Sequence, residues 1–241
     1  MKKSFAPLEA VIFDCDGVLV DSEPLHYQAF QTVLEPLGLG YDYSRYLEHF
    51  IGFDDRDGFL EAFRETGRSL DDRALARLVE AKARAFGEIV LRGVQPFPGV
   101  QDLVRELREQ GVPLAVASGA LRAEIVFFLE ALGLQEAFQV IVAADDVARS
   151  KPDPQTYRLA FEQLKDAAGL GAILSPRTFV AIEDTPAGIR SARAAGLHAV
   201  AVAHSHPAAD LREADTVVEA LADLDLSRLV GFVAGDTHNP M

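Results

Sequence analysis

Two aspartates stand one residue apart where an apolar run ends. The run Ala10–Phe13 is followed by Asp14, Cys15, Asp16 and Gly17. Carboxylates this close raise each other's pKa, and the end of a buried strand solvates them poorly. A divalent cation with a phosphoryl substrate would offset this repulsion, and Gly17 lets the chain turn sharply away from the strand. The pair therefore indicates a metal-dependent site for phosphate chemistry.

Three further stretches place polar groups after apolar runs. These groups are Ser118 and Gly119 after 113–117, Lys151 beyond 140–143, and Glu183 and Asp184 after 179–182. If the runs are parallel strands, their carboxyl ends meet at one edge of the sheet, where functional residues gather. The edge would then carry carboxylates for a hard cation, a hydroxyl and a lysine. Lys151 is notable because the chain has only five lysines against 18 arginines.

The elements that must position these groups follow from the spacing of apolar residues. Short, continuously apolar runs alternate with helical patterns, which is typical of a parallel sheet covered on both faces. We expect strands at 10–13, 113–117, 140–143, 179–182 and 199–202, with helices at 121–132, 154–164 and 186–195. The predicted fold class is therefore α/β, with a Rossmann-like sheet flanked by helices. The series ends at Val202, and the tail from Gly231 is weakly patterned.

One long segment departs from this alternation. Residues 22–93 show helical spacing interrupted by glycines and contain no convincing strand. We therefore predict a small helical bundle inserted into the α/β core. The expected domains are residues 1–21 with 94–241 as the core, and residues 22–93 as the insert.

Composition narrows the function further. The net charge of −14 argues against a nucleic-acid partner, which needs a basic surface. The single cysteine excludes an internal disulfide and favours a reducing compartment. No apolar run approaches the ~18 residues of a membrane span, and the first residues lack a signal peptide's apolar stretch. We expect a cytoplasmic monomer that does not bind membranes.

Four motifs together resemble the haloacid dehalogenase-like superfamily of phosphatases. They are FDCDG at 13–17, ASG at 117–119, SKPDP at 150–154 and IEDTPAGI at 182–189. The stretch DSEPLH at 21–26 and the helical insert resemble the branch that contains β-phosphoglucomutase and phosphoglycolate phosphatase. In that branch the insert is a mobile cap domain, and the substrate is a small phosphorylated metabolite.

The resemblance implies a mechanism and a set of site residues. Asp14 would attack phosphorus and form an aspartyl-phosphate, while Asp16 would move the proton. Ser118 and Lys151 would hold the phosphoryl oxygens. The implied cofactor is Mg²⁺, held by Asp14, the Asp16 carbonyl, Asp184 and Glu183, the last as a direct or indirect ligand. The substrate-binding residues would be Gly17 and Gly119 in the core, and His26, Gly52, Arg56 and Lys82 in the cap.

Several of these residues have a purely structural alternative. Ser118 is placed to cap the helix that follows it, and the 183–184 pair to cap the helix from Pro186. Asp145 and Asp146 fit a solvated loop better than a ligand pair. His26 is also an ordinary residue for a helix.

The choice within the family depends on single residues. Dehalogenases lack the second aspartate, which is present here as Asp16, and phosphonoacetaldehyde hydrolase needs an early cap lysine, absent between Lys3 and Lys82. His26 and Lys82 match β-phosphoglucomutase, but Asp55 stands where that enzyme has an arginine for the second phosphate, and Arg56 is shifted by one. We therefore expect hydrolysis of a small phosphomonoester such as a sugar phosphate. The alternatives are a β-phosphoglucomutase-type transfer and a non-catalytic phosphate-binding module.

Overall fold

The chain forms two units, an α/β unit and a helical unit. The computed structural model describes residues 8–51, 53, 55–171 and 174–235. The α/β unit contains the described residues up to Asp21 and from Gln95 onward, and the helical unit spans Ser22–Val94. No helix in the described residues is long and apolar enough to cross a bilayer.

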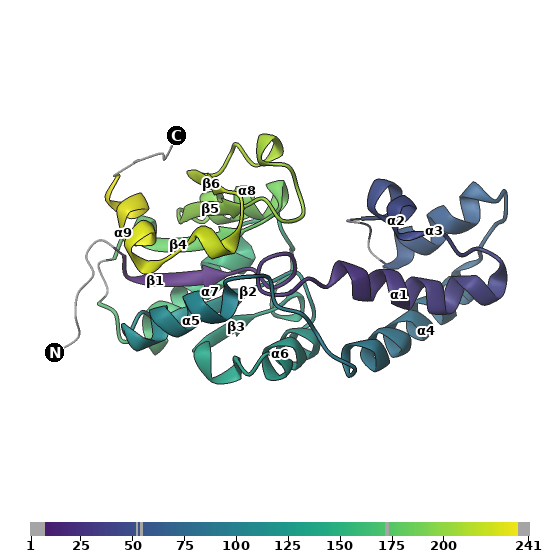
Figure 1. The fold of residues 1–241 in the computed structure, drawn as a ribbon, viewed down its shortest axis with the longest axis horizontal. Helices are drawn as coiled ribbons and strands as arrows, with labels where there is room; N and C mark the ends of the chain where they lie inside the picture. Colours follow the sequence, from purple (N-terminus) through teal and green to yellow (C-terminus); the bar gives the residue numbers. More distant parts are fainter. Residues whose placement is uncertain (1–7, 52, 54, 172–173, 236–241) are drawn as a thin grey trace. The chain divides into compact units, whose positions relative to one another are not determined.

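A six-stranded parallel sheet forms the centre of the α/β unit among the described residues (Figure 1). Its strands are β1 (Ala10–Phe13), β2 (Leu114–Ala117), β3 (Val140–Val142), β4 (Phe179–Glu183), β5 (His198–Val202) and β6 (Thr216–Val218). The strand order is β3-β2-β1-β4-β5-β6. From β1 the chain adds strands first on one side of the sheet and then, starting with β4, on the other. In open parallel sheets ligands bind beyond the carboxyl ends at such a reversal. The predicted α/β fold class is confirmed.

Helices cover both faces of this sheet. They are α5 (Val100–Glu109), α6 (Arg122–Ala131), α7 (Gln155–Ala167), α8 (Pro186–Ala194) and α9 (Leu226–Ala234). Helix α7 packs on β1, β2 and β3, and α8 packs on β5, while α5 and α9 lie on the opposite face (Figure 1). Because both faces are covered, β1, β2, β4 and β5 are buried along their whole length, which explains their continuous apolar runs.

The carboxyl-terminal part extends beyond the predicted series. Strand β6 pairs with β5, and α9 follows it with Leu226 and Leu229 buried. The Asp225 side chain caps α9 by accepting a hydrogen bond from the Arg228 N–H at 2.8 Å. Helix α9 therefore continues to Ala234, past the start of the weakly patterned tail at Gly231. Strand β6 has only three residues, so its sequence carries too little periodicity to be recognised without its partner.

The helical unit surrounds an aromatic core. Its helices are α1 (Glu23–Leu34), α2 (Tyr43–His49), α3 (Asp55–Glu65) and α4 (Asp72–Val90). Helix α1 packs along α4, and α3 packs against α4 as well. Phe30, Tyr46, Phe50 and Phe59 lie in its buried cluster. Short 3-10 helices also occur in the described parts of both units, at Glu35–Leu37, Gln135–Ala137, Ala144–Asp146, Pro176–Thr178, Ala208–Asp210 and Leu221–Asp223.

Candidate active site

The sheet brings the predicted core residues to one edge. Phe13 pairs with Ile182 on one side and with Val116 on the other. Strands β1 and β4 are buried and apolar as far as Phe13 and Ile182, and an acidic residue comes next in each. Asp14 and the pair Glu183–Asp184 consequently lie at the ends of the adjacent strands β1 and β4.

Asp14 is a buried carboxylate with two donors on one oxygen. Its Oδ1 accepts a hydrogen bond from the Cys15 N–H at 2.7 Å and lies 3.0 Å from the Lys151 Nζ. Burial raises the pKa of Asp14 well above its usual range, and the negative charge of Glu183 raises it further, while Lys151 opposes both. The surroundings therefore disfavour the ionised form of Asp14 unless more positive charge is present.

Lys151 joins two of the carboxylates. Its Nζ lies 2.6 Å from the Glu183 Oε1 in addition to the Asp14 contact, and its side chain is only 10% exposed. The aromatic ring of Tyr157 lies beneath the ammonium group at 5.0 Å. Burial would lower the pKa of Lys151, but the charges of Asp14 and Glu183 outweigh burial and raise it. The side chain is thus held as a cation with one of its three donors still to place.

Glu183 accepts hydrogen bonds on both carboxylate oxygens. Oε1 accepts from Lys151 and from the Tyr157 hydroxyl at 2.9 Å. Oε2 accepts from the Asp184 N–H at 3.1 Å, and from the N–H and hydroxyl of Thr185 at 3.3 and 3.1 Å. Burial alone would raise the pKa of Glu183, but Lys151 and these donors lower it. Glu183 is therefore a buried anion that organises the end of β4.

Asp184 is the least satisfied of the three carboxylates. Its Oδ1 is buried without a hydrogen-bond partner among the described residues, while its side chain also bonds to Ser205. Burial, followed by the charge of Glu183, raises the pKa of Asp184 to about 7. An unpaired buried carboxylate oxygen is costly, and a cation is one of the groups that can satisfy it.

These three carboxylates meet the requirements of a hard cation. Asp14, Glu183 and Asp184 each offer an oxygen within 4.8 Å of the others, and all three are buried. Mg²⁺ is held through one or two carboxylates together with water and phosphate oxygens. The orphan Oδ1 of Asp184 and the raised pKa values of Asp14 and Asp184 fit that group, since nearby positive charge would favour both ionised forms.

The remaining predicted core residues lie near this edge in different settings. Asp16 is half-buried, and its charge adds to the raised pKa values of Asp14 and Asp184. Ser118 is buried at the end of β2, where its Oγ accepts from the Ala120 N–H at 3.0 Å. Gly119 is exposed. The Ser118 hydroxyl thus stabilises a local turn. It does not cap α6, which was the structural alternative for this residue.

Gly17 is required by close approach rather than by the turn alone. Its φ is +77°, in the left-handed region that favours glycine. A Cβ atom on this residue would lie 1.9 Å from the Asp184 Oδ2 and 2.8 Å from the Ser205 Oγ. Residue 17 must therefore be glycine for the Asp184 carboxylate to occupy its place.

The predicted residues of the helical unit divide into two groups. Lys82 is buried, and its Nζ donates to the His26 Nδ1 at 2.8 Å and to the Asp55 Oδ1 at 2.6 Å. Burial, followed by the charge of Lys82, lowers the pKa of His26 to about 3. Arg56 is exposed on α3 and does not join this cluster, and Gly52 lies outside the described residues.

The structure adds residues that the sequence motifs did not single out. Tyr157 from α7 and Ser205 after β5 bond to Glu183 and Asp184. The cap of α8 is Thr185, whose Oγ1 accepts from the Gly188 N–H at 3.0 Å, so the structural alternative in which Glu183–Asp184 cap this helix is wrong. A threonine directly before a proline at a helix start is a recognisable cap signal.

Asp145 and Asp146 also have local partners. Asp145 accepts from the Arg122 N–H at 3.0 Å, and Asp146 accepts from the Ala143 N–H at 2.8 Å and pairs with the Arg122 guanidinium. They fix the loop after β3 to the start of α6.

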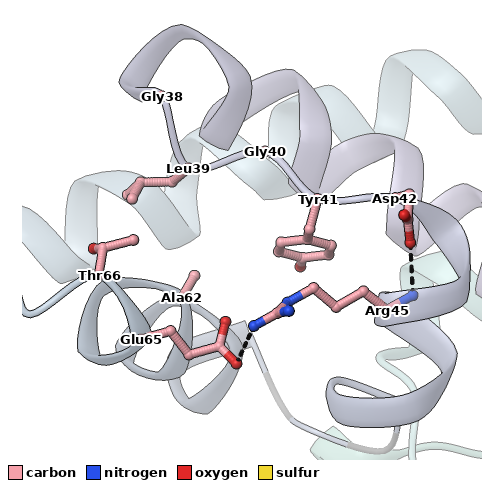
Figure 2. Close-up of a pocket in the computed structure, with 9 residues that line it drawn as sticks. All are labelled: Gly38, Leu39, Gly40, Tyr41, Asp42, Arg45, Ala62, Glu65 and Thr66. Carbon is pink, nitrogen blue, oxygen red and sulfur yellow. Dashed lines mark hydrogen bonds and ion pairs between the residues drawn. The ribbon is translucent and has the colours of Figure 1, made fainter.

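A cavity of about 470 Å³ lies within the helical unit (Figure 2). Arg45 and Glu65 form an ion pair of 2.8 Å beside it, and Tyr41 points toward it from the adjoining loop. None of the predicted site residues lines this cavity. The candidate site is therefore the carboxylate cluster at the sheet edge.

Comparisons with known proteins show the family to which this chain belongs. The family model described as haloacid dehalogenase-like hydrolase matches residues 11–202. That range begins in β1 and ends with β5, so it includes all four motifs of the sheet edge and the helical unit.

Named relatives and solved structures cover nearly the same length. A phosphorylated carbohydrates phosphatase of Thermotoga maritima is 33% identical over 82% of this chain and 87% of its own. A β-phosphoglucomutase of Bacillus subtilis is 28% identical over 92% of this chain and 94% of its own. The crystal structure of CbbY from Rhodobacter sphaeroides in complex with phosphate superposes with a TM-score of 0.77 and 30% identity, covering 92% of this chain and 99% of CbbY.

Proposed function

Because this chain belongs to the haloacid dehalogenase-like hydrolases, we propose that it is a Mg²⁺-dependent phosphatase acting on a small phosphomonoester through an aspartyl-phosphate. The observation that carries this proposal is the cluster of Asp14, Lys151, Glu183 and Asp184 at the ends of β1 and β4. The phosphatase of Thermotoga maritima and the phosphate-bound CbbY support a phosphorylated carbohydrate as the substrate class.

Asp14 is the proposed nucleophile. Its Oδ1 is engaged by the Cys15 N–H and by Lys151, so we assign the attack to Oδ2. The Oδ2–phosphorus bond forms while the bond between phosphorus and the ester oxygen breaks. Asp16 donates its proton to the departing oxygen, which yields an alcohol. It then takes a proton from the water that attacks phosphorus, which releases phosphate and restores the Asp14 carboxylate.

Lys151 and Ser118 are the proposed phosphoryl-binding side chains. Two donors of Lys151 point to Asp14 and Glu183, and the third is available to a phosphoryl oxygen. Glu183 keeps Lys151 charged and in place, so its main role in this proposal is to position the lysine. The N–H groups near Cys15 and Gly119 complete the set, with Gly17 next to Asp184.

Asp14, the Asp16 carbonyl and Asp184 are the proposed metal ligands, with Glu183 behind them. Bound Mg²⁺ would supply positive charge that favours the ionised carboxylates and offsets the negative charge of the phosphoryl group. The unpartnered Oδ1 of Asp184 is the best placed of the described carboxylate oxygens to take such a ligand bond.

The alternative of a β-phosphoglucomutase-type transfer is disfavoured by one contact. A mutase must bind a second phosphate, and Asp55 stands where β-phosphoglucomutase has an arginine for it. The Lys82 ammonium is already paired with Asp55 at 2.6 Å, and His26 is held neutral. We therefore propose that the helical unit, through His26, Gly52, Arg56 and Lys82, selects the alcohol part of a monophosphate.

The proposal is tested by phosphate release from p-nitrophenyl phosphate and from a panel of sugar phosphates, with Mg²⁺ and with EDTA. We expect Mg²⁺-dependent release. Incubation of β-glucose 1-phosphate with a trace of the bisphosphate separates the alternatives, since glucose 6-phosphate without free phosphate would establish the mutase. Absence of turnover on the whole panel, with vanadate still binding, would instead establish a phosphate-binding module. Cytoplasmic localisation and a monomeric state stay predictions.

A further inference from the structure

His204 contacts three separate segments of the α/β unit. Its Nδ1 lies 2.9 Å from the Gly17 carbonyl oxygen, and its Nε2 lies 3.2 Å from the Leu221 N–H nitrogen. The ring stacks on Phe97, with centroids 4.0 Å apart and planes at 16°. His204 itself is the second residue after β5. None of the four motifs of the sheet edge includes it.

The contacts determine the protonation of the ring. The Leu221 N–H is a donor, so Nε2 must accept and carries no proton. The proton of the neutral ring is therefore on Nδ1, which donates to the Gly17 carbonyl. Burial lowers the pKa of His204, which favours this neutral form.

The Gly17 carbonyl belongs to the segment that positions the candidate active site. Gly17 lies three residues after Asp14, and its Cα lies against the Asp184 carboxylate so closely that a Cβ atom would clash. Ser205, the residue after His204, bonds to Asp184 and also lies close to Gly17. Residues 204 and 205 therefore hold both partners of the contact between the loop after β1 and the end of β4.

We propose that His204 is a positioning residue, which holds the Gly17 carbonyl and thereby keeps the loop 14–20 in its position against Asp184. This inference rests on the proposed function, because the position of the loop matters for turnover only if Asp14 and Asp16 perform it. Small displacements of reacting groups cost much of the rate, since catalysis depends on a near-attack geometry. The hydrogen bond to Leu221 and the stacking on Phe97 fix the orientation of the ring, so that Nδ1 points at the Gly17 carbonyl.

Three variants separate the two hydrogen bonds of the ring. Asparagine places an N–H where histidine has Nδ1, and glutamine places an oxygen where histidine has Nε2. His204→Asn can therefore keep the bond to Gly17, His204→Gln can keep the bond to Leu221, and His204→Phe loses both while it retains the stacking surface. Each variant is compared with the wild type for kcat, KM, melting temperature and hydrogen exchange of residues 14–20.

We expect kcat to follow the bond to Gly17. His204→Asn should retain kcat within about threefold, whereas His204→Gln and His204→Phe should lose about tenfold or more, with KM little changed. Hydrogen exchange of residues 14–20 should rise in the same two variants and not in His204→Asn. Retention of kcat by all three variants, or by His204→Gln but not His204→Asn, would overturn the proposal. If the wild type has no turnover, the proposed function fails, and the exchange data still decide whether His204 holds the loop.

Discussion

The carboxylate of Glu183 lies directly against the backbone of Gly188. A Cβ atom on residue 188 would lie 1.8 Å from Oε1 and 2.1 Å from Oε2. The first turn of α8 thus closes over the anion that holds Lys151. This contact makes Gly188 a requirement of the active site even though it lies in a helix, where glycine is otherwise unfavourable.

Gly188→Ala should therefore damage the site. The added methyl group must displace Glu183, which we expect to cost about 1–3 kcal/mol of unfolding free energy and at least tenfold in kcat. Gly87→Ala is the matched control, because residue 87 is an exposed helical glycine whose Cβ would meet nothing within 4 Å. That control should gain up to about 1 kcal/mol and keep full activity. Equal behaviour of the two variants in chemical denaturation and turnover would contradict the role of the contact.

Asp14→Asn should abolish turnover and leave the fold intact. An amide cannot form the acyl-phosphate bond, and its introduction removes a buried charge that lies close to Glu183. The melting temperature should therefore equal or exceed that of the wild type. Asp145→Asn serves as the control at the end of β3, since an amide oxygen can still accept from the Arg122 N–H. Activity retained by Asp14→Asn would refute the nucleophile assignment.

Mg²⁺ should stabilise the wild type through Asp184. Binding to the folded state alone adds about 2.7 kcal/mol when the free cation is at 100 times its Kd. Asp184→Asn should lose this response and should melt at a higher temperature than the metal-free wild type above pH 7, because it removes the carboxylate whose pKa is raised to about 7. Differential scanning calorimetry with Mg²⁺ and with EDTA measures both effects. A response to Mg²⁺ that survives the substitution would place the cation elsewhere.

The two residues of the Lys82–Asp55 ion pair should differ in how much their replacement lowers stability. The Lys82 side chain is 3% exposed, and that of Asp55 is 33% exposed. Asp55→Asn leaves the buried ammonium without its counter-charge and should cost about 2 kcal/mol, less than the ~3–5 kcal/mol of a fully buried pair because Asp55 meets solvent. Lys82→Met should cost less. Glu80→Gln, which breaks the exposed pair with Arg84, should change stability by less than about 1 kcal/mol. Urea denaturation that ranks the three variants otherwise would contradict the burial argument.

The stability of the helical unit should fall in acid because of His26. Its pKa is about 3 in the folded protein and 6.5 in the ordinary state, so the unfolded chain binds the extra proton first as the pH falls below 6.5. Each pH unit below that value should remove about 1.4 kcal/mol from the unfolding free energy. Lys82 from α4 contacts the ring and also pairs with Asp55 from α3, and Phe86 stacks on the ring. His26→Asn keeps an acceptor for Lys82 and should remove this slope, which stability curves between pH 7 and 4 would show.

Much of the fold could be predicted from local patterns. The runs at 10–13 and 179–182 are buried on both faces, so each is apolar without interruption and each ends at a polar residue. Their alternation with helices is enough to imply a parallel sheet, and the meeting of their carboxyl ends then follows from topology. The site residues Asp14, Lys151, Glu183 and Asp184 could be predicted in this way, because each lies next to a recognisable element.

The sequence by itself determined the class of the sheet and the chemical groups at its edge, because these depend on residues that are neighbours in the chain. Tertiary structure alone decided that Tyr157 bonds to Glu183 and Ser205 to Asp184, and that Asp55 pairs with Lys82. It also decided that the Oδ1 of Asp184 has no hydrogen-bond partner among the described residues. These relationships join residues far apart in the chain, or depend on burial, and they arise only when separate elements pack. Local periodicity contains no information about which side chain an approaching helix or loop will meet.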